Sequence, residues 1–120
     1  MNRKRENKRT IGAAYEKIAG EYLKAQGYAI IQYNYRCRAG EIDMIARDGE
    51  YLVFCEVKYR SGGESGHPLE AVDSKKQRVL SKCALYYLAE NGYHDIPCRF
   101  DVVGIFGDKI LVVKDGFDFR

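Results

Sequence analysis

Three carboxylates and a lysine stand at alternating positions in two segments that have the composition of neighbouring β-strands. Glu41 and Asp43 lie in the first segment, and Glu56 and Lys58 lie in the second. Alternate residues of a strand project to the same side, so each pair shares one side of its strand. The Asp48-Gly49 pair between the segments is typical of a two-residue hairpin turn. A turn there predicts that Glu41 faces Glu56, with Asp43 diagonal to it.

Such a grouping of carboxylates is typical of a divalent-metal site. Like charges this close repel unless a cation neutralises them, and oxygen ligands suit Mg²⁺ or Mn²⁺. We expect Asp43 and Glu56 to hold the ion, with the backbone carbonyl of Val57 as a further ligand. Lys58 would orient or help to activate a water and screen charge on a phosphate. The grouping therefore predicts metal-dependent phosphodiester hydrolysis. The alternative is a surface ion pair between Glu56 and Lys58.

Two helical segments carry further polar side chains that could reach this site. Lys76 lies among apolar positions of a helix expected from about Leu69 to Asn91, and so should face the sheet. Glu16 borders the apolar face of an earlier helix. The alternatives are a lysine whose stem packs while its ammonium reaches solvent and an ordinary boundary glutamate. The apolar face of the earlier helix is predicted to be Ile11, Tyr15, Ile18, Ala19, Tyr22 and Leu23.

The predicted elements follow the order αβββαββ. The first helix should begin at Ile11 and end at Gly27. The strands are predicted over residues 28–35, 41–46, 51–59, 99–106 and 109–113. Residues 61–68 hold three glycines and a proline, which predicts a mobile loop. The order indicates an α/β layered domain with a mixed sheet.

The composition excludes several classes of protein. A chain of 120 residues with 46% hydrophobic residues suits one domain with a real core. No apolar run approaches the ~20 residues that span a membrane, and the charged N-terminus lacks the apolar region of a signal peptide. We therefore expect a cytoplasmic protein with no membrane role. The four cysteines form no CxxC pair, so zinc knuckles and thioredoxin-like chemistry are poorly supported.

Basic residues are concentrated at the N-terminus and around the expected site. Residues 1–10 contain five basic residues and one acidic residue, although the net charge of the chain is only +3. We expect residues 1–10 to form a flexible basic arm that binds phosphate backbones, or a solvated tail, followed by a single domain over residues 11–120. Residues that flank the site and could contact nucleic acid are Arg36, Arg38, Arg60, Lys75 and Arg78.

The same segments carry a family resemblance. The segments are GAAYEKIAGEYL, GYAIIQYNYRCRAGEIDMIARD, LVFCEVKYR, EAVDSKKQ and RFDVV, and they run from Gly12 to about Asp115. They resemble the YraN-like family of bacterial proteins, which is similar to archaeal Holliday junction resolvases. The wider group is the restriction-endonuclease-like, or PD-(D/E)xK, superfamily. GEIDMI followed by EVKYR at this spacing is a specific signal, whereas EVK alone would be weak.

The resemblance implies a restriction-endonuclease-like αβββαβ core with an added C-terminal strand and a divalent-metal site. The acidic helix residue of the family corresponds to Glu16, and the motif aspartate to Asp43. The E-x-K pair corresponds to Glu56 and Lys58. The helical lysine and its neighbour correspond to Lys76 and Gln77, so Gln77 joins the expected catalytic set. Ile42 stands at the motif proline, as it does in the YraN-like pattern.

Three functions remain open from the sequence. The first is a nuclease acting on branched or flap DNA, in which cleavage of two strands of a junction would favour a homodimer. The second is a non-catalytic nucleic-acid-binding module of the same fold that acts with protein partners. The third is a protein-interaction scaffold. A complete set of carboxylates and lysine favours the nuclease, because a binding module gains little from clustered negative charge.

Overall fold

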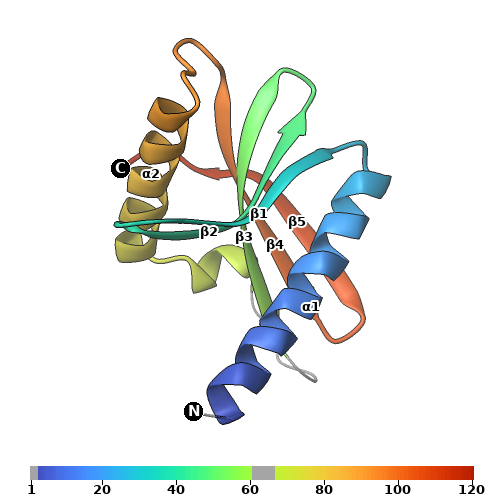
Figure 1. Ribbon diagram of the computed structural model, residues 1–120. Coiled ribbons are helices and arrows are strands. Elements are labelled where there is room, and N and C mark those ends of the chain that lie inside the picture. Colours follow the sequence, from blue (N-terminus) through green and yellow to red (C-terminus); the bar gives the residue numbers. More distant parts are fainter. Residues whose placement is uncertain (1–2, 61–66) are drawn as a thin grey trace.

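The computed structural model describes residues 3–60 and 67–120, so most of the expected loop over residues 61–68 lies outside the described residues. The elements are α1 (Arg3–Ala25), β1 (Ala29–Cys37), β2 (Gly40–Asp48), β3 (Tyr51–Arg60), the 3₁₀ helix η1 (Pro68–Ala71), α2 (Ser74–Glu90), β4 (Cys98–Phe106) and β5 (Lys109–Phe117). The five strands form one sheet, with a helix packed against each of its faces (Figure 1). The predicted αβββαββ order is confirmed.

The sheet is mixed, as the sequence predicted. Its strand order is β1-β2-β3-β4-β5; β3 and β4 are parallel, and the other neighbours are antiparallel. A parallel pair needs a long crossover connection, and η1 and α2 lie in this connection. The arrangement has the αβββαβ core with a mixed sheet and an additional C-terminal strand that the resemblance implied.

Each face of the sheet has its own apolar core. On the α2 side, Phe54 and Phe100 pack against Leu80 and Tyr87 of the helix. On the α1 side, the core contains Ala19 and Leu23 of the helix together with residues such as Val53 of β3. Successive residues of β3 enter opposite cores, which explains why this strand is apolar on both sides.

The first helix is longer than predicted and is rotated from the predicted orientation. It begins at Arg3, so residues 3–10, which were expected to form an arm separate from the domain, continue the helix. Ile11 and Ile18 were expected in the core, but each is 47% exposed. The reason is a close approach at Gly20, where any side chain would overlap the Tyr33 hydroxyl. This contact turns Ala19 and Leu23 inward and leaves both isoleucines outside.

The β2–β3 hairpin turns one residue later than predicted. Asp48 pairs with Tyr51, so the turn is Gly49-Glu50, with Gly49 at φ 60°. The expected turn at Asp48-Gly49 is therefore wrong. Asp48 stays in the strand because its carboxylate accepts a hydrogen bond from the guanidinium of Arg99 at 2.8 Å. Following this register toward the other end of the hairpin brings Asp43, rather than Glu41, opposite Glu56.

The second helix also differs from its predicted bounds. Residues Pro68–Ala71 form η1, and α2 begins only at Ser74. Asp73 caps α2, since its carboxylate accepts a hydrogen bond from the backbone N–H of Lys76 at 2.8 Å. The cap fixes Lys76 in the first turn of α2. Among the described residues, no helix is long and apolar enough to cross a membrane.

Candidate metal site

The site lies where β2 and β3 separate. Their backbone pairing ends at Met44 and Cys55, although β2 begins at Gly40 and β3 continues to Arg60. Beyond this point the β1–β2 hairpin bends toward α2, and Gly40 comes within reach of the side chain of Val79 (Figure 1). We call the place where β2 and β3 separate, beyond Met44 and Cys55, the fork. Asp43 bridges it, because its Oδ2 accepts a hydrogen bond from the backbone N–H of Val57 at 2.8 Å.

Asp43 lies where the side chains of both strands of the β1–β2 hairpin exchange faces of the sheet. Residues two apart in a regular strand share a face, yet Tyr33 packs in the α1-side core and Tyr35 in the α2-side core. Met44 and Ile42 on β2 are divided in the same way. The exchange of faces occurs at Asn34, which has φ 56°, and at Asp43 beside it. Asp43 is therefore placed between the two layers, where groups from both helices can reach it.

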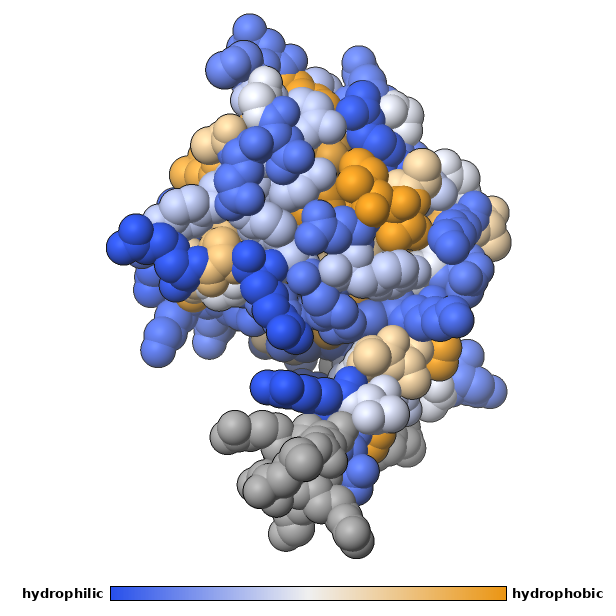
Figure 2. Space-filling view, viewed as in Figure 1, coloured by the Kyte–Doolittle hydropathy of each residue, from blue (hydrophilic) through white to orange (hydrophobic). Residues whose placement is uncertain are grey.

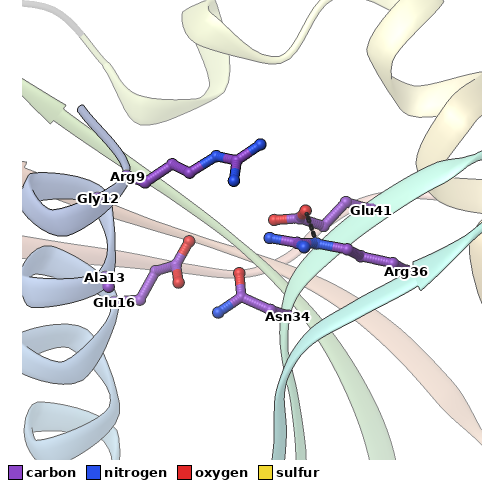
Figure 3. Close-up of a pocket in the computed structure, with 7 residues that line it drawn as sticks. All are labelled: Arg9, Gly12, Ala13, Glu16, Asn34, Arg36 and Glu41. Carbon is purple, nitrogen blue, oxygen red and sulfur yellow. Dashed lines mark hydrogen bonds and ion pairs between the residues drawn. The ribbon is translucent and has the colours of Figure 1, made fainter. Parts of the chain in front are cut away.

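Three carboxylates from α1 and β2 converge at this break. Oxygen atoms of Glu16, Glu41 and Asp43 lie within 4.8 Å of one another. Glu16 is held by its neighbours on α1, because Tyr15 stacks on Tyr59 of β3 with ring centroids 4.1 Å apart. Figure 3 shows Glu16 and Glu41 on opposite sides of the hollow between α1 and the hairpin. These separations are small enough for one ion to contact all three groups.

A fourth carboxylate, that of Glu56, is almost completely buried beside them. Its side chain is 3% exposed, and its Oε2 lies 3.1 Å from the ammonium of Lys58 and 3.5 Å from that of Lys76. Its other oxygen, Oε1, has no hydrogen-bond partner within the described part of the chain. A buried carboxylate oxygen without a partner is costly, and a bound cation would satisfy it.

The electrostatics of the four carboxylates show an excess of negative charge. Burial and the adjacent Glu56 carboxylate raise the pKa of Asp43 to about 9, although the Val57 N–H opposes this shift. Burial also raises the pKa of Glu16, with smaller contributions from Glu41 and Glu56, while hydrogen bonds from Asn34 and Asp43 lower it. Without a cation, burial and mutual repulsion therefore favour a proton held between Asp43 and Glu56.

The residues present fit a divalent cation. Glu16, Glu41, Asp43 and Glu56 would carry four negative charges, whereas Lys58 and Lys76 at Glu56 and Arg36 at Glu41 supply three positive charges. The donors are all carboxylate oxygens, which suits Mg²⁺ or Mn²⁺ rather than a thiolate- or imidazole-preferring metal. The fit rests on the donor set and on the unsatisfied Oε1 of Glu56.

The structure brings together most of the residues that the sequence nominated. Glu16, Asp43, Glu56, Lys58 and Lys76 all lie at the fork. Val57 contributes its N–H to Asp43, and the role expected for its carbonyl stays a prediction. Gln77 is engaged elsewhere: its amide donates to the carbonyl of Val72 at 3.0 Å and accepts from Arg120 at 2.7 Å.

The five nominated nucleic-acid contacts are exposed, and one of them, Arg36, is tied to the carboxylates. Arg36 forms an ion pair with Glu41 at 2.8 Å. Arg60 donates a hydrogen bond to the carbonyl of Tyr59. The exposed residues are Arg36, Arg38, Arg60, Lys75 and Arg78. Exposure on the surface is compatible with phosphate contact and does not establish it.

Two participants were missed from the sequence. Asn34 adopts a positive φ within β1 and faces Glu16, whose pKa it lowers. An asparagine in an otherwise aromatic strand was the available signal, since Asn tolerates positive φ better than most residues. Arg9 lies beside Glu16 in the hollow (Figure 3). It was assigned to the arm, and only the longer α1 brings it to the site.

The fold and the site together define a mixed-sheet α/β protein with a partly buried carboxylate cluster where its second and third strands separate. The chain belongs to the family described as "Uncharacterised protein family UPF0102", which matches residues 15–105. It is 49% identical over 113 residues to a UPF0102 protein of Lachnoclostridium phytofermentans, covering 93% of this chain and 96% of the relative. It is 54% identical over 97 residues to a UPF0102 protein of Symbiobacterium thermophilum, covering 81% and 82%. A UPF0102 protein of Geotalea daltonii is 45% identical over 120 residues, covering 96% and 94%.

Proposed function

We propose that this protein is a divalent-metal-dependent nuclease that hydrolyses phosphodiester bonds in structured DNA of the branched or flap kind. One observation carries the proposal: Glu16, Glu41 and Asp43 converge next to the buried Glu56, and these four carboxylates face three cations, Lys58 and Lys76 at Glu56 and Arg36 at Glu41, with one Glu56 oxygen unsatisfied within the described residues. A structural ion pair needs equal charges, whereas a site that binds a cation and an anionic substrate needs an excess of carboxylate. The resemblance to resolvases supports the same reaction class.

The carboxylates would bind and position the ion. Asp43 and Glu56 occupy the centre, and Glu16 and Glu41 can contribute from α1 and β2. A bound Mg²⁺ or Mn²⁺ would supply charge stabilisation at the phosphate and lower the pKa of a water. The hydrogen bond from Val57 N–H to Asp43 Oδ2 fixes one oxygen and leaves the other for the ion. The shift in the pKa of Asp43 indicates that binding displaces a proton from this carboxyl.

The two lysines would act on charge rather than on the ion. Lys58 follows Glu56 by two residues and shares its face of β3, and its side chain is 28% exposed. Its ammonium can therefore contact both Glu56 and a substrate phosphate, where it would stabilise developing negative charge. Lys76 approaches Glu56 from α2 and is 37% exposed. It provides a second cation on the side opposite Glu16.

The proposal extends to the setting of the reaction. The substrate would be DNA in the cytoplasm, and a homodimer would place two sites on one branched molecule. The exposed arginines and lysines around the fork would contact its backbone. The competing function is a non-catalytic nucleic-acid-binding module that acts with protein partners.

The decisive experiment compares cleavage with binding in a Lys58→Ala variant. Losing one electrostatic contributor should lower the cleavage rate on flap and four-way DNA by about 10²-fold or more. Metal and DNA affinity should stay within a few-fold, because the carboxylates hold the ion. Lys82→Ala is the matched control, since Lys82 is an exposed lysine of α2 outside the site. Cleavage should be measured with Mg²⁺ and Mn²⁺, and binding with Ca²⁺.

Two results would contradict the proposal. One is the absence of cleavage by the wild-type protein with every substrate and ion. The other is a Lys58→Ala protein that cleaves as fast as wild type. A binding module predicts that Lys58→Ala loses affinity and that there is no metal-dependent cleavage to lose.

A further inference from the structure

A polar groove runs along α1 beside the edge strand β1 and passes the carboxylates. It consists of two hollows, of about 600 and about 380 Å³. Both are lined by Ala13, Glu16 and Asn34, so they are continuous with each other. The N-terminal half of α1 stands out from the body of the molecule, and the groove opens beside it (Figures 1 and 2). We call this feature the α1–β1 groove.

The sequence of α1 creates this groove. Arg9, Ala13, Lys17 and Lys24 recur at helical spacing and face β1. The residues at the centre of this stripe, Gly12 and Ala13, are too small to fill the space opposite Asn34 and Arg36. An added side-chain atom on Gly12 would meet nothing within 4 Å. The helix is brought close to β1 only further along, where Gly20 rests on Tyr33. The groove therefore arises from the small residues Gly12 and Ala13 of α1, rather than from a separation of α1 and β1 along their whole length.

Cations stand at both ends of the groove, with the carboxylates between them. Arg9 and Arg36 project into one end from α1 and β1, as Figure 3 shows. Lys17 and Lys24 lie at the other end, where Lys24 is paired with Glu21. Among the side chains of residues 7–60 and 67–120, neither Arg9 nor Lys17 has an ion-pair partner. The distance along the helix from Arg9 to Lys24 is about 22 Å at 1.5 Å per residue.

We propose that the α1–β1 groove binds an unpaired strand of nucleic acid and guides it past the carboxylates. The proposal rests on the nuclease function and names its substrate class: a single-stranded flap, branch or end. The lining combines four cations and three carboxylates with one aromatic residue, Tyr33, and a bound metal ion would add to its positive charge. Cations together with an aromatic ring are what single-strand binders use. Each hollow has the volume of a small-ligand site, which suits one backbone with its bases. The two backbones of a duplex, separated by grooves roughly 6–12 Å wide, do not both enter it.

The same residues predict where the phosphates of a bound strand would lie. Phosphates would rest on Arg9 and Arg36 at one end and on Lys17 at the other. The phosphate between them is carried over Glu16 and Glu41, where negative charge repels it unless a cation is bound. Occupation of the groove and of the metal site are thus coupled, and each should raise the affinity for the other.

The test plugs the groove without altering any charge. Ala13→Phe places a ring in the groove, and Ala14→Phe is its matched control, since Ala14 is also exposed on α1 and lines neither hollow. The probes are a fluorescein-labelled DNA strand of about 15 nucleotides, its blunt duplex, and a flap with the same unpaired arm. Anisotropy is measured with Ca²⁺, and circular dichroism checks that both variants keep the native helix content.

We expect wild type to bind the single strand and the flap more tightly than the duplex. Ala13→Phe should weaken strand binding by about tenfold or more, the scale of losing a base–aromatic or phosphate contact, and Ala14→Phe should not. Equal binding of duplex and strand, or equal effects of the two substitutions, would overturn the proposal. If Ala13→Phe blocks strand binding but no ion supports cleavage by wild type, the groove stands and the nuclease function fails. If Ala13→Phe cleaves as fast as wild type, the nuclease function stands and the groove proposal fails.

Discussion

Two charged clusters lie at opposite ends of the β2–β3 pairing, and they are built on opposite principles. At the turn end, the buried carboxylate of Asp101 accepts hydrogen bonds from Tyr28 at 2.7 Å, from Arg99 at 2.9 Å and from the backbone N–H of Asp115 at 2.9 Å. At the fork, Glu56 is buried to a similar degree, yet one of its oxygens has no partner within the described residues. The first cluster satisfies its polar groups, and the second leaves some of them unsatisfied.

The two clusters also differ in how their acidic groups are balanced by cations. Arg99 lies between Asp48 and Asp101, and Lys114 adds a second cation at 3.4 Å from Asp48. Hydrogen bonds from Arg99 and Lys114 hold the pKa of Asp48 below its usual range. At the fork the pKa of Asp43 is raised instead. The pKa of Asp48 is thus lowered by paired cations, whereas that of Asp43 is raised by burial and by a neighbouring carboxylate.

The largest effect is expected from breaking the satisfied cluster. Asp101→Ala leaves the guanidinium of Arg99 buried without its main partner, and it should lower the free energy of unfolding by about 3–5 kcal/mol. Tyr28→Phe removes a hydroxyl that donates to Asp101 and accepts from Arg99, and it should cost less, about 2 kcal/mol. Urea unfolding of both variants measures the difference. A loss below 1 kcal/mol for Asp101→Ala would show that the cluster does not hold the fold.

At the fork, by contrast, removing a carboxylate charge should increase the stability of the fold. Asp43 binds its proton more tightly in the folded state than in the unfolded state, so its contribution to stability is present at pH 4 and is lost as the pH rises toward 9. Asp43→Asn keeps an acceptor for Val57 N–H and has no charge to bury. It should be more stable than wild type by about 2 kcal/mol at pH 8 in EDTA. The gain should vanish at pH 4.

Thermal unfolding at the two pH values tests this expectation, with Mg²⁺ as a further variable. The ion should stabilise wild type and narrow its difference from Asp43→Asn, because only wild type offers the full set of ligands. A variant that is less stable than wild type at pH 8 without metal would contradict the charge excess at the fork.

Metal binding should depend on pH because it displaces the Asp43 proton. Between pH 6 and 8 the affinity for Mn²⁺ should rise about tenfold per pH unit, as one proton leaves for each ion bound. Calorimetry in buffers of different ionisation enthalpy measures that proton. Asp43→Ala should bind weakly and without this dependence. Equal binding by wild type and Asp43→Ala would show that Asp43 is not a ligand.

The smallest effect should appear in the salt dependence of nucleic-acid binding. Arg36 stands at the fork and Lys114 at the satisfied cluster, and both side chains are more than half exposed. Replacing Arg36 with Gln should reduce the slope of log affinity against log salt by roughly 0.7–0.9, the contribution of one phosphate contact. Lys114→Gln should leave the slope unchanged. An equal salt slope in Arg36→Gln and Lys114→Gln would show that Arg36 at the fork does not contact a phosphate.

The candidate site was predictable because its residues conflict with their surroundings. Asp43, Glu56 and Lys58 interrupt apolar strands, and Lys76 interrupts an apolar helix face, so local pattern alone places them near one another. The register of the hairpin was not predictable from its turn. Asp48-Gly49 has the composition of a turn, but Asp48 is held in the strand by Arg99, a residue 51 positions away in sequence.

The rotation of α1 was missed for a similar reason. Ile11 and Ile18 fit an apolar stripe, and periodicity does not reveal that Gly20 would dock on Tyr33. The satisfied cluster was also missed as a unit. Tyr28, Asp48 and the Arg99–Asp101 pair come from three strands or their borders, and nothing local connects the three. Contacts that depend on the assembled sheet remain beyond a single-sequence pattern.

The hairpin that holds Asp43 and Glu56 also has a kinetic consequence for folding. Both carboxylates belong to one local β2–β3 hairpin, which closes at a small entropic cost. Lys76 joins them only when the crossover returns and β3 pairs with β4, a slow long-range step. Lys58 belongs to the same hairpin, so repulsion between the two acids is met early with one of the two lysines in place, before Lys76 arrives. Low pH or a divalent ion should for this reason accelerate folding more than it slows unfolding, so the chemistry of the site is already present on the folding pathway.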